Sequence, residues 1–254
     1  MRGKQFLDAL YRRWLEIKKP VQGTFSGVDE SGYYYLVEPD SQRRVFVSHP
    51  RRLGYYASGV AARVDKLATE YGVADLELFP DDQVVDVGAH SGEFGLWVER
   101  FGANYFALEP DPVAYGALER NFPNGQLRNL AAGAEDGSLE FFLNTSTGDS
   151  SLVNKSAKSI RTAVSPLDSL VAEAFPKGTI AVLKVEAEGY EPEVLLGAQK
   201  TLGRTRIVTV DAGEERLGES TAPQCLNFLY RVGFELDFVY LKRGIFRLRN
   251  QSLK

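Results

Sequence analysis

The chain has 254 residues, of which 44% are hydrophobic and 25% charged, a composition typical of a soluble globular protein with one α/β domain and an extension. Its 30 basic and 34 acidic side chains give a formal net charge of −4, which argues against a general nucleic-acid-binding protein. With one cysteine, Cys225, and two histidines, neither an internal disulfide nor a zinc cluster is possible, and we expect a reducing, cytoplasmic location.

The first twenty residues predict a basic amphipathic helix that ends at Pro20. Apolar residues recur at helical spacing between Phe6 and Ile17, and lysines and arginines occupy the opposite face. Such a helix packs on its own domain or in a homo-oligomer, or it makes weak contact with an anionic membrane surface. We expect no signal peptide, because a cleavage site of small residues is missing. No window approaches the ~18 apolar residues of a transmembrane segment.

Residues 21–75 predict a small β structure followed by a helix. The segments "GYYYLVEP" and "RRVFVSHP" are rich in aromatic and β-branched residues, and the turn-forming "DSQ" separates them. A hairpin or a three-stranded patch is therefore expected, with a helix over residues 55–70. We divide the chain into an N-terminal extension, residues 1–75 (amphipathic helix, β hairpin, helix), and a second domain, residues 76–254.

From Gln83 onward, strands alternate with helices. Strands are predicted at residues 83–88, 104–110, 126–132, 138–144, 180–186 and 206–212. Helices are predicted at 93–102, 112–122, 167–175, 191–202 and 222–233. This alternation predicts a Rossmann-like, doubly wound α/β fold with a mainly parallel sheet. Residues 235–250 predict an antiparallel C-terminal edge hairpin around the turn at residues 242–244.

The stretch "VVDVGAHSGEFG", residues 84–95, predicts a ligand-binding turn. In doubly wound sheets the ligand lies beyond the carboxyl ends of the strands, and Gly88 and Gly92 let the backbone bend and approach it closely. A dinucleotide fingerprint, G-x-G-x-x-G, would have its second glycine where this chain has His90. We therefore favour S-adenosylmethionine (SAM), which has no phosphate, over NAD. Asp86, which ends the strand, is expected to organise the ammonium group of the ligand.

The next strand predicts the ribose site. Glu109 follows Asp86 by 23 residues, near the ~20-residue interval that places an acid beside ribose hydroxyls in such folds. Its carboxylate can accept both hydroxyl hydrogens. Pro110 ends this strand, and the backbone of Leu130 and Ala131 is expected to contact the adenine. The predicted SAM-binding residues are Asp86, Gly88, Ala89, His90, Gly92, Glu109, Pro110, Leu130 and Ala131.

The segment "LKVEAEGYE", residues 183–191, predicts the catalytic residues. In a strand, Lys184, Glu186 and Glu188 project to one side, which is unusual in a buried sheet unless that face opens on a site. We interpret Glu186 as general base or metal ligand, Glu188 as the second choice, and Lys184 as the group that sets their charge. A structural ion pair is the alternative. Glu186 and Asp211, which ends the neighbouring strand, are candidates to hold a divalent cation.

These motifs together resemble the FkbM-type family of SAM-dependent methyltransferases over residues 84–211. The matching segments are "DVGAHSG", "EPDPVAYGALERN", "NLAAGAEDGSLEFF", "SPLDSL" and "LKVEAEGYEPEVLLGA". The chain departs from the family pattern at His90, Glu186 and Asp211, where the family has Asn, Asp and Glu. The resemblance implies a class I methyltransferase fold and O-methylation of a sugar, polysaccharide or secondary-metabolite hydroxyl, hence a small-molecule or glycan acceptor.

Two other functions remain open. A non-catalytic module that binds SAM or a nucleotide would use the same turn, although the charged cluster between Lys184 and Glu188 favours an enzyme. An NAD-dependent oxidoreductase would share the strand–helix–strand unit, but its full glycine fingerprint is missing.

Overall fold

The computed structural model describes residues 26–253 except 39, 144–149, 155 and 157, so the predicted N-terminal helix lies outside the described residues. A seven-stranded sheet, in the order β12-β13-β11-β10-β4-β5-β6, forms its centre. Its strands are β4 (Gln83–Val87), β5 (Asn104–Leu108), β6 (Gln126–Arg128), β10 (Ile180–Val185), β11 (Thr205–Asp211), β12 (Phe234–Tyr240) and β13 (Ile245–Asn250). Within this sheet the neighbouring strands β11, β10, β4, β5 and β6 pair in parallel, and the antiparallel β12–β13 hairpin joins β11 antiparallel. The predicted doubly wound fold with an antiparallel edge is confirmed.

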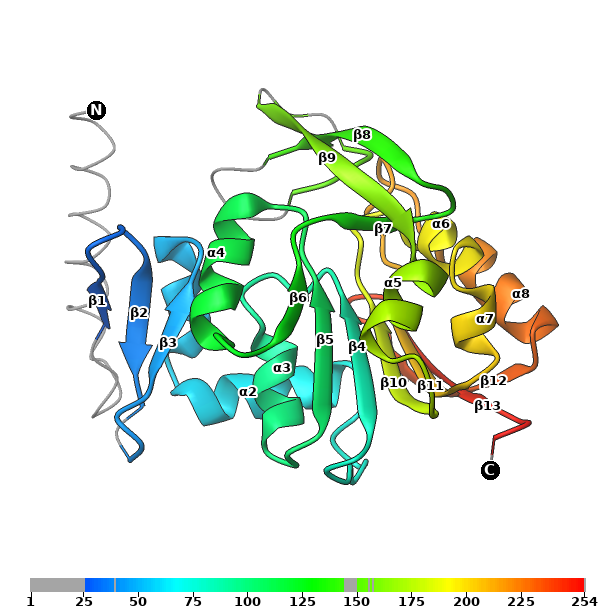
Figure 1. Ribbon diagram of the computed structural model, residues 1–254, viewed down its shortest axis with the longest axis horizontal. Coiled ribbons are helices and arrows are strands. Elements are labelled where there is room, and N and C mark those ends of the chain that lie inside the picture. Colours follow the sequence, from blue (N-terminus) through cyan, green and yellow to red (C-terminus); the bar gives the residue numbers. More distant parts are fainter. Residues whose placement is uncertain (1–25, 39, 144–149, 155, 157, 254) are drawn as a thin grey trace.

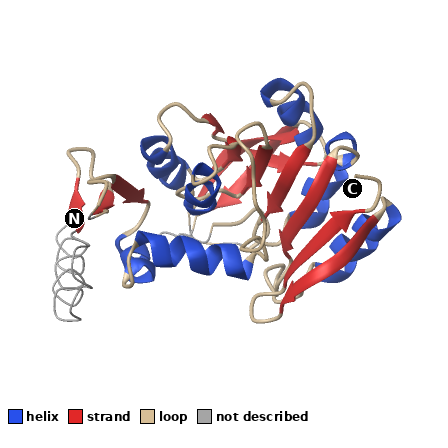
Figure 2. Ribbon diagram, turned by 90° about the horizontal axis from the view of Figure 1, so that it is seen from below, coloured by secondary structure: helices blue, strands red, loops and turns tan. Residues whose placement is uncertain are grey.

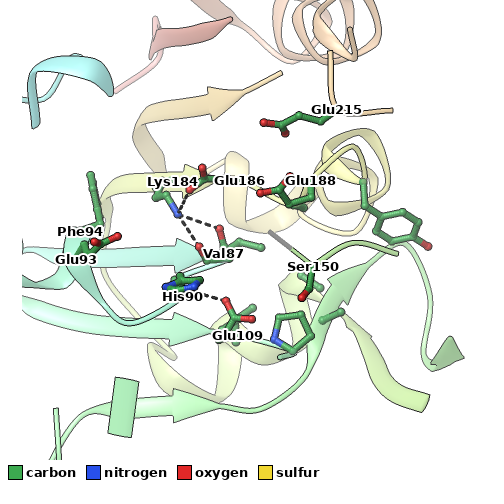
Figure 3. A pocket seen from close by; sticks show the side chains of 18 of the residues that line it. Val87, His90, Glu93, Phe94, Glu109, Ser150, Lys184, Glu186, Glu188 and Glu215 are labelled. Atoms are coloured by element: carbon green, nitrogen blue, oxygen red, sulfur yellow. Dashed lines mark hydrogen bonds and ion pairs between the residues drawn. The ribbon is translucent and has the colours of Figure 1, made fainter. Parts of the chain in front are cut away.

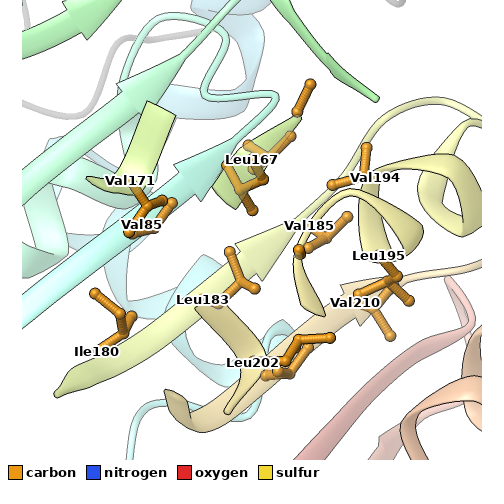
Figure 4. Packing of buried hydrophobic residues seen from close by; sticks show 14 of the residues in the cluster. Val85, Leu167, Val171, Ile180, Leu183, Val185, Val194, Leu195, Leu202 and Val210 are labelled. Atoms are coloured by element: carbon orange, nitrogen blue, oxygen red, sulfur yellow. The ribbon is translucent and has the colours of Figure 1, made fainter. Parts of the chain in front are cut away.

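Helices cover both faces of this sheet, as Figures 1 and 2 show. One face carries α2 (Val60–Glu70), α3 (Glu93–Glu99) and α4 (Pro112–Asn121). The other carries α5 (Leu167–Ala174), α6 (Glu191–Leu196), α7 (Gln199–Leu202) and α8 (Ala222–Arg231). Because both faces are buried, a central strand such as β10 is buried along its whole length. Figure 4 shows Val85, Leu183 and Val210 of the sheet beside side chains of α5 and α6.

The predicted helix over residues 191–202 is two helices. The chain turns at Gly197, where an added Cβ would lie 1.9 Å from the carbonyl oxygen of Gly133. The carboxylate of Asp168 then caps α7, because its two oxygens accept the N–H groups of Lys200 (2.9 Å) and Thr201 (2.7 Å). Close packing against a distant strand therefore breaks a helix whose apolar pattern is continuous.

A second, three-stranded sheet has the order β7-β9-β8. It contains β7 (Ala131–Gly133), β8 (Gly137–Phe142) and β9 (Ser159–Pro166), of which β9 was not predicted. The predicted single strand 126–132 is wrong, because the chain leaves the central sheet after β6 and pairs with β9 from residue 131. The turn is fixed by Asn129, whose Nδ2 donates to the carbonyl oxygen of Glu109 (2.8 Å).

The described part of the N-terminal extension forms an antiparallel sheet of β1 (Ser26–Val28), β2 (Tyr34–Val37) and β3 (Arg44–Val47), as expected, followed by a 3₁₀ helix, η1 (Pro50–Tyr56). The predicted helix 55–70 begins only at Val60, after Gly59 with φ +95°. The sheet lies against α4 (Figure 1), where Asn121 Nδ2 donates to the Phe46 carbonyl (2.8 Å) and Oδ1 accepts the Phe46 N–H (2.7 Å).

The extension and the central sheet share one hydrophobic core. Val45 of β3, Tyr56 of η1 and Val64 of α2 belong to the same buried cluster as Val84 and Ile207 of the central sheet. The described part of the extension therefore packs on one face of the central sheet and shares its hydrophobic core. Within the described part of the chain, none of the helices combines the length and apolar character needed to cross a bilayer.

Candidate active site

A cavity of about 440 Å³ lies at the carboxyl ends of β4, β5 and β10, with η1 and α2 on one side. Ten of the predicted site residues line it: Gly88, Ala89, His90, Glu109, Pro110, Leu130, Ala131, Lys184, Glu186 and Glu188. Three predicted residues do not line it, namely Asp86, Gly92 and Asp211. Figure 3 shows this cavity with its charged side chains.

The glycine turn after β4 is shaped by contacts within the protein. Gly88 has φ +74°, and an added Cβ would lie 1.7 Å from the carbonyl oxygen of Glu186. An added Cβ at Gly92 would lie 2.5 Å from the ring of Phe122. We expected the glycines to let the backbone approach a ligand. In the structure, the backbone at Gly88 approaches the end of β10 instead, and the backbone at Gly92 approaches α4. These contacts fix the turn that forms one wall of the cavity.

His90 connects this turn to the end of β5. Its backbone N–H donates to Glu109 Oε2 (2.8 Å), while its ring Nε2 lies 3.0 Å from Ser48 Oγ and Nδ1 lies 2.9 Å from Ser91 Oγ. Burial, reinforced by the positive charge of Arg52, lowers the pKa of His90 to about 3. The imidazole is therefore neutral, and hydroxyl groups engage both of its nitrogens.

Glu109 is held with its carboxylate at the cavity wall (Figure 3). Its Oε2 accepts the N–H of His90, and its Oε1 accepts the N–H of Asp111 (2.8 Å). Burial raises the pKa of Glu109 to about 8, although the two backbone N–H groups favour the ionised form. The side chain is thus fixed by the backbone of two neighbouring loops and is 6% exposed.

Asp86 and Lys184 form a buried ion pair beneath the cavity. Lys184 Nζ lies 2.8 Å from Asp86 Oδ1, 2.8 Å from the carbonyl oxygen of Gly88 and 3.1 Å from Glu186 Oε2. The other oxygen of Asp86 accepts the hydroxyl of Tyr105 (2.7 Å). Asp86 is fully buried and does not reach the cavity. Asp86 therefore holds Lys184 and does not contact the cavity directly, and a contact through water with the ammonium group of a ligand stays a prediction.

Glu186 is surrounded by donors. Its Oε2 accepts the hydroxyl of Tyr71 (2.5 Å), and its Oε1 pairs with Nη2 of Arg243. Burial alone would raise its pKa, but the charges of Lys184 and Arg243 hold the pKa of Glu186 well below its usual range. A carboxylate stabilised in this way has little tendency to take a proton.

The donors around the predicted metal site do not fit a divalent cation. Arg243 Nη2, which pairs with Glu186, also lies 2.5 Å from Asp211 Oδ2, so a guanidinium stands between the two carboxylates. Among the described residues, no group of three or more His, Cys, Asp or Glu side chains could hold a metal ion. Hard cations require several oxygen ligands, whereas these oxygens already face a positive charge.

Glu188 does not continue the alternation of β10. The strand ends at Val185, and Glu188 has φ +50°. The prediction that residues 184, 186 and 188 project to one side therefore holds only for Lys184 and Glu186. The carbonyl oxygen of Glu188 accepts the hydroxyl of Ser151 (2.8 Å). Its side chain lines the cavity beside that of Glu186 (Figure 3).

Most other residues of the cavity were not predicted, among them Tyr71, Arg243 and Glu215. Tyr71 follows the last turn of α2, Arg243 lies in the turn of the C-terminal hairpin, and Glu215 lies in the loop after β11. Their local sequences are ordinary for a helix end, a turn and a loop. The fold alone brings them to the same cavity, so no local signal identifies them.

Comparison with known proteins agrees with this geometry. The family model described as the methyltransferase FkbM domain matches residues 86–236, more than half of the chain. The 2-O-methyltransferase NoeI of Sinorhizobium fredii (strain NBRC 101917 / NGR234) is 23% identical over 202 residues, which cover 70% of this chain and 83% of that protein.

The fold also matches a crystal structure, that of methyltransferase FkbM from Methylobacillus flagellatus KT, with a TM-score of 0.50 and 18% identity. The match covers 78% of this chain and 52% of the crystallised chain, so the present chain spans about half the length of that protein. The motifs, the sheet order and the family match lead to the same assignment. The chain belongs to the FkbM family of methyltransferases.

Proposed function

We propose that the protein is a SAM-dependent O-methyltransferase that acts on a hydroxyl group of a sugar or another small molecule. The position of Glu109 carries this proposal. Its carboxylate is held at the cavity wall by the N–H groups of His90 and Asp111, beside the glycine turn that follows the first parallel strand. In doubly wound folds an acid at this place binds ribose hydroxyls.

The size and lining of the cavity support the binding of SAM. A volume of about 440 Å³ lies within the ~300–1,000 Å³ range of small-molecule sites. Glu109 would accept the ribose hydroxyls, and the apolar side chains of Leu130, Ala131 and Phe141 would contact the adenine. The turn at residues 88–90 would lie along the amino-acid part of the ligand. NAD is disfavoured because the half-buried His90 occupies the second glycine position of its fingerprint.

In the proposed reaction, SAM supplies a methyl group activated by its sulfonium. The protein holds the acceptor oxygen in line with that methyl group, and such positioning contributes up to ~7–11 kcal/mol in the best cases. The ion network of Lys184, Glu186 and Arg243 fixes the cavity floor. We assign Glu186 a positioning role toward Tyr71 and Arg243, because cations already balance the negative charge of its carboxylate.

Two observations support a hydroxyl-bearing, sugar-like acceptor. The relative from Sinorhizobium fredii is described as a 2-O-methyltransferase. At the cavity mouth, Tyr55 is 54% exposed, and the guanidiniums of Arg63 and Arg52 lie 4.9 Å and 5.6 Å from its ring centroid. An exposed aromatic ring with polar neighbours offers an apolar face and hydrogen bonds to a pyranose.

The test is methyl transfer from radiolabelled SAM to a panel of acceptors. The panel contains methyl pyranosides and oligosaccharides, together with amine- and thiol-bearing compounds. We expect label on hydroxyl acceptors, and its loss in a Glu109→Ala variant. Label on amines alone would contradict O-methylation. Binding of SAM without transfer to any acceptor would favour the non-catalytic module, and binding of NADH in place of SAM would favour the oxidoreductase.

A further inference from the structure

We propose that Glu215 is the group that takes the proton from the acceptor hydroxyl during methyl transfer, an inference that rests on the function proposed above. Glu215 lies in the loop after β11 and lines the cavity. Figure 3 shows its carboxylate turned toward those of Glu186 and Glu188. This is the side of the cavity away from Glu109, where an acceptor would meet the methyl group.

One oxygen of Glu215 is enclosed and has no hydrogen-bond partner. Its Oε2 is buried, and nothing among the described residues donates to it. A buried carboxylate oxygen without a donor is costly, because it loses water and gains nothing in return. Such an atom in the wall of an enzyme cavity is explained when a substrate supplies the missing donor. An acceptor hydroxyl is a donor of this kind.

Five other described carboxylates in or under this cavity contact donors or cations, and Asp211, whose Oδ1 also lacks a hydrogen-bond partner among the described residues, does not line the cavity. Glu186 is paired with Lys184 and Arg243, and Glu109 accepts two backbone N–H groups. Glu93 accepts the hydroxyl of Tyr56 (2.8 Å) and pairs with Arg63 (3.3 Å). Glu70 pairs with Lys66 (3.6 Å), and Asp211 with Arg243 (2.5 Å). Burial alone would raise the pKa of Glu186 and of Glu93, but the positive charges of Lys184 and Arg63 beside them hold both values below the ordinary range, which makes these two carboxylates weak bases.

The loop that carries Glu215 is held firmly. The carbonyl oxygen of Glu215 accepts Asn154 Nδ2, and Asn154 Oδ1 accepts the N–H of Leu217 (3.1 Å). The next residue, Arg216, makes a bidentate pair with Glu193 of α6 (2.7 and 3.0 Å). At Gly189 an added Cβ would lie 2.9 Å from the Glu215 carbonyl oxygen. A base must be held within hydrogen-bond reach of its proton, and these contacts provide that rigidity.

The charges around Glu215 favour proton uptake. Burial raises its pKa most strongly, and the negative charges near it raise it further: Asp211 on β11, Glu186 and Glu188 after β10, and Glu191 on α6. The cations that face this region, Lys184 and Arg243, are paired with Asp86, Glu186 and Asp211. A positive sulfonium that enters the cavity would favour the ionised carboxylate. SAM binding would thus prepare Glu215 to accept a proton.

The proposed step conserves atoms, electrons and charge. The acceptor O–H bond breaks and its proton goes to a carboxylate oxygen of Glu215, while an oxygen electron pair forms the new O–CH₃ bond. The S–CH₃ bond breaks, its electron pair stays on sulfur, and the sulfonium becomes a neutral thioether. Glu215 is left protonated beside a neutral product, and it returns the proton to solvent after release.

The first experiment measures proton release on ligand binding by calorimetry in buffers of different ionisation enthalpy. SAM is compared with its demethylated product, which lacks the positive sulfur but shares the ribose and amino-acid groups. We expect SAM to release more protons than the product near pH 8 in the unmodified protein and in Glu214→Gln, a control at an exposed neighbour. In Glu215→Gln this difference should disappear. A difference that persists in Glu215→Gln would overturn the proposal.

The second experiment uses an acceptor identified with the panel described above. We expect Glu215→Gln to lower kcat by ~10²–10⁴-fold at saturating SAM while the variant still binds SAM, and Glu215→Asp to recover part of the loss. Glu214→Gln should keep full activity. An unchanged kcat with a higher KM for the acceptor would overturn the proposal. Absence of SAM binding in the unmodified protein would instead overturn the proposed function, so the two failures are distinguishable.

Discussion

Lys184 Nζ lies 2.8 Å from Asp86 Oδ1, and the two residues are direct neighbours in the register of the parallel strands β10 and β4. The side chain of Lys184 is 3% exposed and that of Asp86 is not exposed at all. The pair begins a row of alternating charges under the cavity: Asp86, Lys184, Glu186, Arg243 and Asp211. Each charge contacts one of opposite sign, which allows five ionic groups to lie at the end of a buried sheet.

Removal of Lys184 should destabilise the protein strongly. In Lys184→Met the carboxylate of Asp86 stays buried without its cation, and loss of one partner of a buried pair costs ~3–5 kcal/mol. Urea denaturation should show this decrease, while Lys200→Met, at an exposed position, should change the unfolding free energy little. The double variant Asp86→Asn/Lys184→Met should recover part of the loss. Equal stability of Lys184→Met and the unmodified protein would contradict the role of the pair.

The glycine at position 88 should be irreplaceable for steric reasons. Gly88→Ala adds a Cβ 1.7 Å from the Glu186 carbonyl oxygen, in addition to the strain of φ +74°. Gly102→Ala is the matched control, because φ there is +67° but no heavy atom lies within 4 Å of the added Cβ. We expect the control to cost about 1–2 kcal/mol in thermal or urea unfolding, and Gly88→Ala to cost more. Similar costs at both sites would show that φ strain alone matters.

Asn121 should control the attachment of the N-terminal sheet. Its side chain makes both hydrogen bonds to Phe46, and its Nδ2 also donates to the carbonyl oxygen of Ser91 (2.7 Å). Asn121→Ala leaves these backbone groups without partners, and we expect faster amide hydrogen exchange over residues 44–47. Asn104→Ala, on the exposed start of β5, should leave that exchange unchanged. Unaltered protection in Asn121→Ala would contradict this attachment.

The ionisation of Glu109 should reduce stability as pH rises. Burial raises its pKa from 4.5 to about 8, so the folded state holds this proton more tightly than the unfolded state does. The stability linked to it is fully present below about pH 4.5 and is lost as pH rises through about 8. We expect Glu109→Gln, which cannot ionise, to gain stability over the unmodified protein between pH 5 and pH 9, by a few kcal/mol. A pH-independent difference between the two unfolding free energies would contradict this.

The regular parts of the fold follow from the sequence, and the exceptions have local causes. Alternating strands and helices predict the parallel sheet because each strand is a continuous apolar run. The path after β6 was not predictable, since Asn129 ends the pairing through a contact with Glu109, 20 residues away. Gly197 breaks a helix because of Gly133, a residue of another strand. Such tertiary contacts leave no trace in local periodicity.

The candidate site, too, could be predicted from the sequence only in part. The motif positions Gly88, His90, Glu109 and Glu186 were correctly predicted to meet at one cavity, because each follows a neighbouring parallel strand. Their chemistry was less predictable. Whether Glu186 is a base or an ion-pair partner depends on Arg243, which is 57 residues away in the sequence. The environment of a carboxylate, rather than its presence, decides its pKa, and that environment is tertiary.

The most direct test of the account is calorimetric titration of SAM into the unmodified protein, Glu109→Ala and Glu119→Ala. Glu119 is exposed on α4 and does not line the cavity, so it serves as the control. Heat unfolding first verifies that all three proteins are folded. We predict micromolar binding to the unmodified protein and the control, and ~10–100-fold weaker binding to Glu109→Ala, because two hydrogen bonds between its carboxyl group and the ribose hydroxyls are lost. Equal SAM affinity in all three proteins would contradict the assignment of this cavity as the cofactor site.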